Sequence, residues 1–287
     1  MQIVSDRGMD LSPEQSAGLD IHLVPLTFTL DGKTYRSGVD IQPAEFYKLL
    51  EATESFPTTS QPAPGDFAEV YRRLAATDPE ILSVHISSGL SGTLNSAQQG
   101  AKMVPEARVT LYDTKTLSGA EGWHVEAAAR AAQAGWPMPR ILDMLRKITQ
   151  ATDTVFTLAE LKYLIHGGRI SHMKGLLASV LGIKPIIGVE KDLGKYAQMG
   201  QARTLNQAIG KIVDLIAHRY PPGAALRTQA MHADNPEGAA LLRQKMSERF
   251  ACTWLPVSSI APVLGAHTGP TLVGVAYAPL AAFPELP

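Results

Sequence analysis

An apolar strand pattern that runs directly into a hydroxyl-rich loop and then into a helix pattern is the feature that most constrains this chain. Residues 81–86 read Ile-Leu-Ser-Val-His-Ile, and residues 87–92 read Ser-Ser-Gly-Leu-Ser-Gly. A helix pattern follows over residues 92–103. A strand that is followed at once by a helix is typical of α/β folds, in which ligands bind beyond the carboxyl ends of the strands.

The first half of the chain repeats this alternation. Further strand patterns lie at 21–28 and 108–112, and helix patterns lie at 43–53, 65–76, 120–134 and 140–150. Such an alternation predicts a mostly parallel sheet that is covered by helices on both faces.

A second group of elements begins after residue 153. Strand patterns lie at 154–158, 226–231 and 271–277, and helix patterns lie at 205–218 and 236–250. The sequence therefore predicts two α/β domains, residues 1–153 and residues 154–287. The last strand leaves a second interpretation open, in which it returns to the first domain.

The loop after residue 86 has the chemistry of a receptacle for a small anion. Unpaired N–H groups at a helix N-terminus attract negative charge. Ser87, Ser88, Ser91 and Thr93 also offer more hydroxyls than one helix cap uses. The alternative is an ordinary N-cap without a ligand. The loop lacks the lysine of a Walker A loop and the Gly-x-Gly-x-x-Gly spacing of a dinucleotide site, so a carboxylate or a single phosphate suits it better than a nucleotide.

Composition argues against several classes of protein. With 26 basic and 27 acidic residues the net charge is −1, so no nucleic-acid surface is expected. The single cysteine, Cys252, and the absence of histidines at metal-ligand spacing predict that the chain holds no metal and no cofactor. No apolar run approaches the roughly 18 residues of a membrane span. No signal peptide precedes the first strand, so we expect a cytoplasmic protein.

Five motifs, in this order along the chain, resemble those of the DegV family. They are Thr59-Ser-Gln-Pro62, Ile86-Ser-Ser-Gly-Leu-Ser-Gly-Thr-Leu-Asn-Ser-Ala97, Tyr163-Leu-Ile-His-Gly-Gly-Arg-Ile-Ser171, Leu181-Gly-Ile-Lys-Pro-Ile-Ile187 and Gly265-Ala-His-Thr-Gly-Pro270. The resemblance covers essentially the whole chain. One loop departs from it, because Asp6-Arg7-Gly8 stands where the family usually has Asp-Ser-Thr.

The resemblance implies two α/β domains with a long-chain fatty acid, such as palmitate or oleate, in a pocket between them. Members of the family resemble the acyl-carrier subunits of bacterial fatty acid kinase, which hold the fatty acid while a separate ATP-dependent kinase subunit phosphorylates its carboxylate. On this pattern the chain is a lipid-binding protein without catalytic residues of its own, and a fatty acid kinase subunit is its partner.

The resemblance also implies roles for particular residues. Thr59 and Ser91 would bind the carboxylate through their hydroxyls, and the amide of Gly92 would assist. His267 would stand at the mouth of the pocket, in what we expect to be a loop of small residues. Further pocket candidates are Ser60, Thr93, Ile165 and Leu181.

Two arginines and a set of apolar residues complete the expected site. Arg169 and Arg203 are expected on the face that meets the kinase. Apolar residues of the second half are candidates for the walls of the acyl tunnel, although each of them also fits an ordinary core position. These are Leu161, Leu164, Ile165, Leu177, Leu181 and Ile183.

Two other functions remain open from the sequence alone. Ser91 and His267, with an acid such as Asp113 or Asp6, have the residue types of a serine hydrolase or acyltransferase. Ser91 does not fit the Gly-x-Ser-x-Gly nucleophile elbow, because Thr93 stands where the second glycine would be. The other alternative is a regulator that binds a nucleotide or a sugar phosphate.

Overall fold

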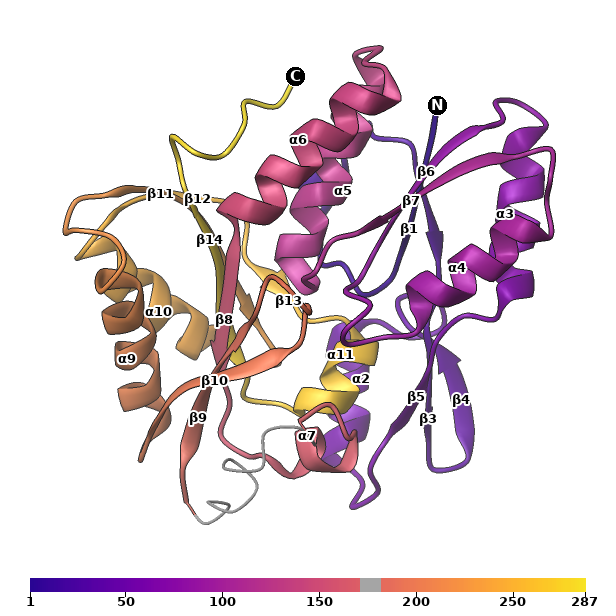
Figure 1. The fold of residues 1–287 in the computed structure, drawn as a ribbon. Helices are drawn as coiled ribbons and strands as arrows, with labels where there is room; N and C mark the ends of the chain where they lie inside the picture. Colours follow the sequence, from indigo (N-terminus) through magenta and orange to yellow (C-terminus); the bar gives the residue numbers. More distant parts are fainter. Residues whose placement is uncertain (171–181) are drawn as a thin grey trace.

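Two large sheets with helices between them and on their outer faces form the protein (Figure 1). In the computed structural model, residues 1–170 and 182–287 are described. The strands are β1 (Gln2–Asp6), β2 (Ile21–Val24), β3 (Thr27–Leu30), β4 (Lys33–Arg36), β5 (Thr58–Ser60), β6 (Glu80–His85), β7 (Arg108–Asp113), β8 (Asp153–Thr157), β9 (Lys184–Val189), β10 (Tyr196–Ala202), β11 (Ala225–His232), β12 (Ala251–Trp254), β13 (Ser258–Ser259) and β14 (Val273–Pro279). The helices are α1 (Pro13–Ser16), α2 (Pro43–Glu51), α3 (Pro64–Ala75), α4 (Thr93–Lys102), α5 (Ser118–Gln133), α6 (Met138–Ala151), α7 (Lys162–His166), α9 (Leu205–Ala217), α10 (Pro236–Ser247) and α11 (Pro262–Thr268).

The first sheet has the strand order β2-β1-β6-β7, and all of its pairings are parallel. Helices α3 and α4 pack on one face and α5 on the other. Side chains of β1 alternate accordingly: Ile3 belongs to the core on the α5 side and Val4 to the core under α3 and α4. The mostly parallel sheet that was predicted for the N-terminal half is therefore confirmed.

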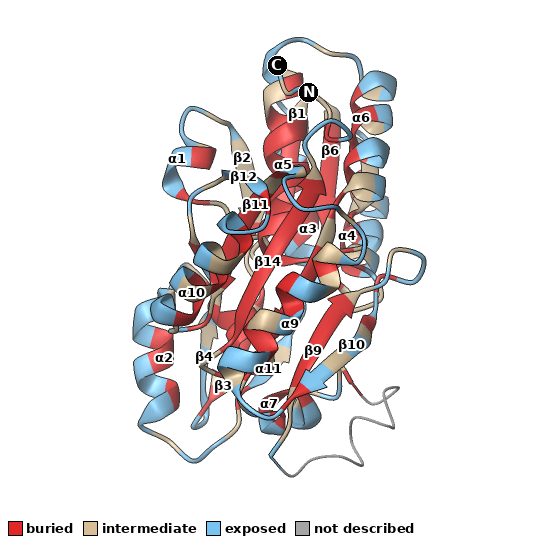
Figure 2. Cartoon of the chain, turned by 90° about the vertical axis from the view of Figure 1, so that its left-hand side faces the viewer, coloured by how far each residue is buried: buried red, intermediate tan, exposed pale blue. Residues whose placement is uncertain are grey.

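The second sheet has the order β10-β9-β8-β14-β11-β12, and β13 continues beside β11. Strand β11 pairs in parallel with β12 and β13, whereas the other pairings are antiparallel. The last strand, β14, lies in the middle of this sheet between β8 and β11. Helices α9 and α10 pack against the sheet, and β14 is buried along almost its whole length (Figure 2).

Helix α5 lies between the two sheets and contacts strands of both. Its composition explains how it fits, because alanines and glycines stand at positions where longer side chains would collide with neighbouring residues. A Cβ on Gly119 would lie 2.8 Å from the sulfur of Met231, and one on Gly122 would lie 2.8 Å from a methyl of Leu11. A single hydrophobic core consequently contains residues of both sheets, such as Leu82 of β6 and Phe156 of β8.

Two of the predicted elements were wrong. The strand predicted at 21–28 is broken at Pro25, which has no N–H to donate to a ladder. Its second part, β3, instead forms a small antiparallel sheet of order β4-β3-β5. The loop predicted around His267 is helix α11, which begins with Pro262 at its first turn and packs against α2, α7, β3 and β5.

No helix among the described residues is long and apolar enough to span a membrane.

A buried hydrogen-bond network joins β1 to the end of β6. The Asp6 carboxylate accepts from the main-chain N–H groups of Gly8 (2.7 Å) and Ile86 (3.1 Å), and it also bonds Nδ1 of His85 (2.8 Å). His85 Nε2 bonds the hydroxyl of Ser83 at 2.7 Å, and both Asp6 and His85 are fully buried. The carboxylate therefore fixes the point at which β6 turns into the loop of residues 87–92.

We predict that Asp6→Ala lowers the free energy of unfolding by about 3–5 kcal/mol, because it leaves buried donors without an acceptor. Urea unfolding followed by circular dichroism measures this value. Asp20→Ala is the matched control, since the exposed Asp20 pairs with His22 at 3.3 Å and its loss is expected to cost less than about 1 kcal/mol. Equal stabilities of the two variants would contradict the role given to Asp6.

Candidate functional site

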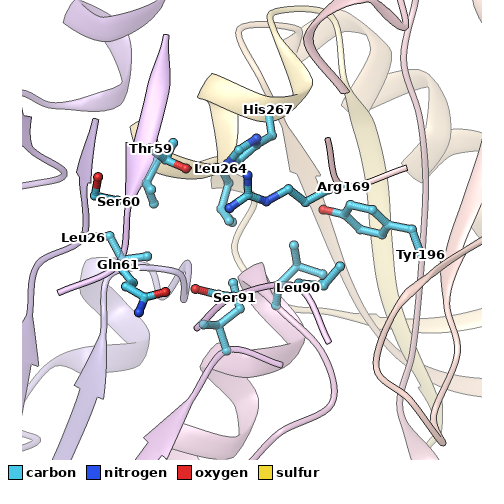
Figure 3. Close-up of a pocket in the computed structure, with 13 residues that line it drawn as sticks. Leu26, Thr59, Ser60, Gln61, Leu90, Ser91, Arg169, Tyr196, Leu264 and His267 are labelled. Carbon is cyan, nitrogen blue, oxygen red and sulfur yellow. Dashed lines mark hydrogen bonds between the residues drawn. The ribbon is translucent and has the colours of Figure 1, made fainter. Parts of the chain in front are cut away.

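A cavity of about 280 Å³ opens where the loop after β6, strand β5 and helix α11 meet (Figure 3). Residues from both sides of residue 153 line it. Its polar lining residues are Thr59, Ser60, Gln61, Ser91, Arg169, Tyr196 and His267. Its apolar lining residues are Leu26, Ile86, Leu90, Leu117, Val263 and Leu264.

Ser91 lies at the positive end of helix α4. It directly precedes Gly92, the N-cap of that helix, and its hydroxyl bonds the hydroxyl of Thr93 at 2.8 Å. The first N–H groups of a helix have no partner within the helix, and the helix dipole adds a partial positive charge there. Thr93 itself is fully buried and lies outside the lining, so it acts on the cavity through Ser91.

Gly92 leaves room for the Gln61 side chain beside the start of α4. A Cβ at this position would clash with the side-chain carbonyl oxygen of Gln61. Gln61 in turn donates from Nε2 to the hydroxyl of Ser96 in α4 (3.1 Å). Gln61 thus ties β5 to the helix N-terminus and lines the cavity beside Ser91. It stands in the Thr-Ser-Gln-Pro motif that the sequence singled out, although no role was predicted for it.

Thr59 and His267 are joined directly across the cavity wall. Thr59 Oγ1 and His267 Nε2 lie 2.8 Å apart. Burial, together with the nearby charges of Arg169 and His166, lowers the pKa of His267 to about 3. The imidazole is therefore neutral at physiological pH.

When Nε2 of His267 carries the proton, the imidazole donates to Thr59, and the Thr59 hydroxyl can donate to a bound anion. A carboxylate only accepts hydrogen bonds, so the Thr59 hydroxyl must act as the hydrogen-bond donor to such a ligand. Its oxygen is then free to accept from Nε2–H of His267. This tautomer places the lone pair on Nδ1, which is buried, packs against Gly167 and has no hydrogen-bond partner among residues 1–170 and 182–287.

Arg169 lies in the cavity rather than on an outer face. Its guanidinium donates from Nη1 to the carbonyl of Gly167 (2.7 Å) and lies near His267 and Tyr196 (Figure 3). Burial lowers the pKa of Arg169, but the group stays charged at neutral pH. Among the described lining residues it supplies the one full positive charge. The sequence placed this residue on the kinase-facing side, and its position in the cavity was missed.

The other predicted residues fall in several places. Ser60 lines the cavity, whereas Ile165 lies outside the lining and is 38% exposed. Arg203 lines a separate surface groove between β10 and α9, together with Ile183. The predicted tunnel residues Leu161 and Leu164 are ordinary core residues. Two further predictions lie outside the described residues, namely Leu177 and Leu181.

A second, almost wholly apolar void of about 20 Å³ continues inward from the cavity. The two spaces share three lining residues, Leu117, Tyr196 and Leu264. Beyond them the void is lined by side chains from between the two sheets, including Phe156 and Met231. Among the described residues, the apolar walls therefore come from strand ends and the loops beside them, from Leu117 and from α11. The described candidates Leu161, Leu164, Ile165 and Ile183 do not line them.

The geometry does not assemble the catalytic triad that was considered as an alternative. Within residues 1–170 and 182–287 no hydrogen bond joins Ser91 to His267. Ser91 bonds Thr93, and His267 bonds Thr59. The carboxylate of Asp113 accepts hydrogen bonds from Ser88, and the carboxylate of Asp6 is bonded to His85 in the core. A serine nucleophile needs its base within hydrogen-bond reach and an acid that orients the base. In the part of the chain that is described, no group of His, Cys, Asp and Glu could hold a metal ion.

Comparisons with known proteins agree with one another. The chain matches the family described as "uncharacterised protein, DegV family" over residues 1–280. A DegV domain-containing protein of Listeria innocua is 32% identical over 277 residues, which are 96% of this chain and 97% of that protein.

Solved structures show the same relationship. A fatty acid-binding DegV family protein from Thermus thermophilus is 31% identical, with a TM-score of 0.87 over 97% of this chain and 99% of that one. A stearic acid-binding protein from Eubacterium ventriosum is 26% identical, with a TM-score of 0.83 over 97% of this chain and 98% of that one. Because the family match spans residues 1–280 and these relatives align over nearly their whole length, this chain belongs to the DegV family.

Proposed function

We propose that this protein binds one long-chain fatty acid, with its carboxylate in the cavity beside Thr59, Ser91 and Arg169 and its tail directed between the two sheets. The observation that carries this proposal is the polarity of the space formed by the cavity and the adjoining void, which share three lining residues. Its outer part holds hydroxyls, a helix N-terminus and a guanidinium, and its inner part is apolar. The Thermus thermophilus and Eubacterium ventriosum proteins, described as binding a fatty acid and stearic acid, support it.

The carboxylate end needs several donors, because burying an unpaired charge is very costly. Hydroxyl and guanidinium donors to a charged group each contribute about 1.5–3 kcal/mol. Thr59 and Ser91 stand at the two sides of the cavity (Figure 3), so both can donate to one carboxylate. Gly92 adds the N-terminal end of α4.

The tail supplies most of the affinity. Each buried CH₂ contributes about 0.8 kcal/mol, so a tail of more than a dozen carbons gives roughly 10 kcal/mol before the costs of association. Palmitate and oleate both have tails of this size. The preference for a carboxylate with a long apolar tail, rather than for a nucleotide or a sugar phosphate, follows from the apolar inner part of the space.

We further propose that the protein presents the bound carboxylate to a separate ATP-dependent fatty acid kinase and has no chemistry of its own. The cavity opens to the surface, so a partner can reach the carboxylate. Arg203, Lys211 and Asp214 line the groove between β10 and α9, so its lining holds two positive charges and one negative charge. Because the proposed partner uses ATP, we expect the protein to act in the cytoplasm.

Thr59→Ala and Ser91→Ala are each expected to weaken palmitate binding about tenfold, since each removes one donor to the carboxylate. Isothermal titration calorimetry measures the Kd, and circular dichroism confirms that the variants are folded. Thr58→Ala is the matched control, because Thr58 is exposed on the same strand and does not line the cavity. If both test variants bound palmitate with wild-type affinity, the carboxylate would not bind at Thr59 and Ser91.

Arg169→Gln is expected to lower the affinity for palmitate at least tenfold and to leave the affinity for hexadecan-1-ol nearly unchanged. The alcohol carries no charge, so it gains little from the guanidinium. Competition against a fluorescent fatty acid measures both affinities. If Arg169→Gln bound palmitate as the wild type does, the residue would be excluded from the head-group site.

Arg203→Ala is expected to leave palmitate binding intact and to slow acyl phosphate formation several-fold when the protein is combined with its cognate kinase. The reason is that the groove lined by Arg203 is separate from the cavity. Arg73→Ala, at an exposed position of α3, is the control. An unchanged rate for Arg203→Ala would remove this residue from the proposed contact with the kinase.

A further inference from the structure

The turn between β9 and β10, residues 190–195, docks on the loop that carries Ser91. The hydroxyl of Ser87 donates to the main-chain carbonyl of Gly194 at 2.7 Å. Gly194 has a positive φ of 64° and packs directly on the Ser87 hydroxyl, which leaves no room for a Cβ. Two segments far apart in the sequence are thus held together by one side-chain hydrogen bond and a close main-chain contact.

Gly89 makes the second part of this contact. A Cβ on Gly89 would clash with the carbonyl oxygen of Leu193 and lie 2.7 Å from that of Gly194. Its φ is not in the left-handed region, so alanine fits its backbone conformation. The glycine is therefore needed for the approach of the turn and not for the shape of its own loop.

The loop side of the contact is firmly held. The main-chain N–H of Ser87 donates to Thr116 (2.8 Å), and the Ser87 carbonyl accepts from Leu90 and Ser91 (both 3.0 Å). The turn side is more exposed, and Leu193 has 57% of its surface accessible. Lys191, at the start of the turn, also donates to the carbonyl of Gln150 and pairs with Asp153 at 3.3 Å. If the contact opens, residues 192–195 are therefore the part that moves.

The turn leads directly into Tyr196, which lines both the cavity and the inner void. Tyr196 follows the turn as the first residue of β10, and it is one of the three residues shared by the cavity and the inner void. The void of about 20 Å³ is too small for a long acyl tail, so these residues must separate when the tail enters. The other two, Leu117 and Leu264, stand at the start of α5 and within α11, and all three residues are buried in the same core.

From these contacts we propose that the β9–β10 turn, docked on Ser87 and Gly89, is the wall that moves when the acyl tail enters or leaves. Ser87 and Gly89 then set the rate of fatty acid exchange. This inference rests on the proposed function, because it concerns the ligand of the same cavity. It adds two residues that do not contact the carboxylate in the proposed pose.

The test compares Gly89→Ala with Gly65→Ala, whose added methyl has nothing within 4 Å. Stopped-flow fluorescence with cis-parinaric acid gives the association and dissociation rate constants. In Gly89→Ala both are expected to rise about tenfold, with less than about a threefold change in Kd, because the docked contact is worth about one hydrogen bond. Gly65→Ala is expected to match the wild type.

Ser87→Ala is the second test variant and keeps the experiment decisive if Gly89→Ala does not fold. It removes the hydroxyl that donates to Gly194 and accepts from the main-chain N–H of Gly89 (3.1 Å), but keeps the main-chain bonds to Leu90 and Ser91. Both rate constants are again expected to rise. Rate constants equal to those of Gly65→Ala, or a rise in dissociation alone, would overturn the inference and leave the proposed function standing. A wild-type protein that binds no fatty acid would overturn both.

Discussion

The packing of helix α5 between two sheets is the constraint on which the rest of the structure depends. The helix is buried on nearly all sides, and its small residues allow both sheets to approach it. Because of this approach, residues of both halves of the chain share one core. The cavity and the inner void meet at Leu117, immediately before the first turn of α5. A tail that enters there reaches the apolar layer between the sheets without crossing a polar surface.

The polar end of the cavity is organised for an acceptor that carries a negative charge. Burial keeps His267 neutral, which leaves Arg169 as the full positive charge of the described lining. The hydroxyls of Thr59 and Ser91 each have a neighbour that can donate to their oxygen, His267 and Thr93 respectively. Each hydroxyl can therefore turn its proton toward the ligand. Charge, hydroxyl direction and the dipole of α4 all favour a carboxylate at the same point.

Local patterns predicted much of the fold and part of the site. The strand, loop and helix of residues 81–103 were predictable because the apolar run, the glycines and the helix pattern stand next to one another in the sequence. The role of Arg169 was not, since its direction depends on the Gly167 carbonyl and on how α7 packs against α11. The strand break at Pro25 was readable from the sequence but was missed. The contact of Ser87 with Gly194 joins residues over a hundred positions apart, and no local pattern reports it.

Native mass spectrometry of the freshly purified protein, followed by denaturing extraction of what is bound, tests the central claim most directly. The account predicts one fatty acid per chain, released on denaturation, with a long acyl tail. The extracted mass would also identify the chain length and unsaturation that the space between the sheets accepts. A protein that carries no fatty acid and takes up neither palmitate nor oleate would contradict the account.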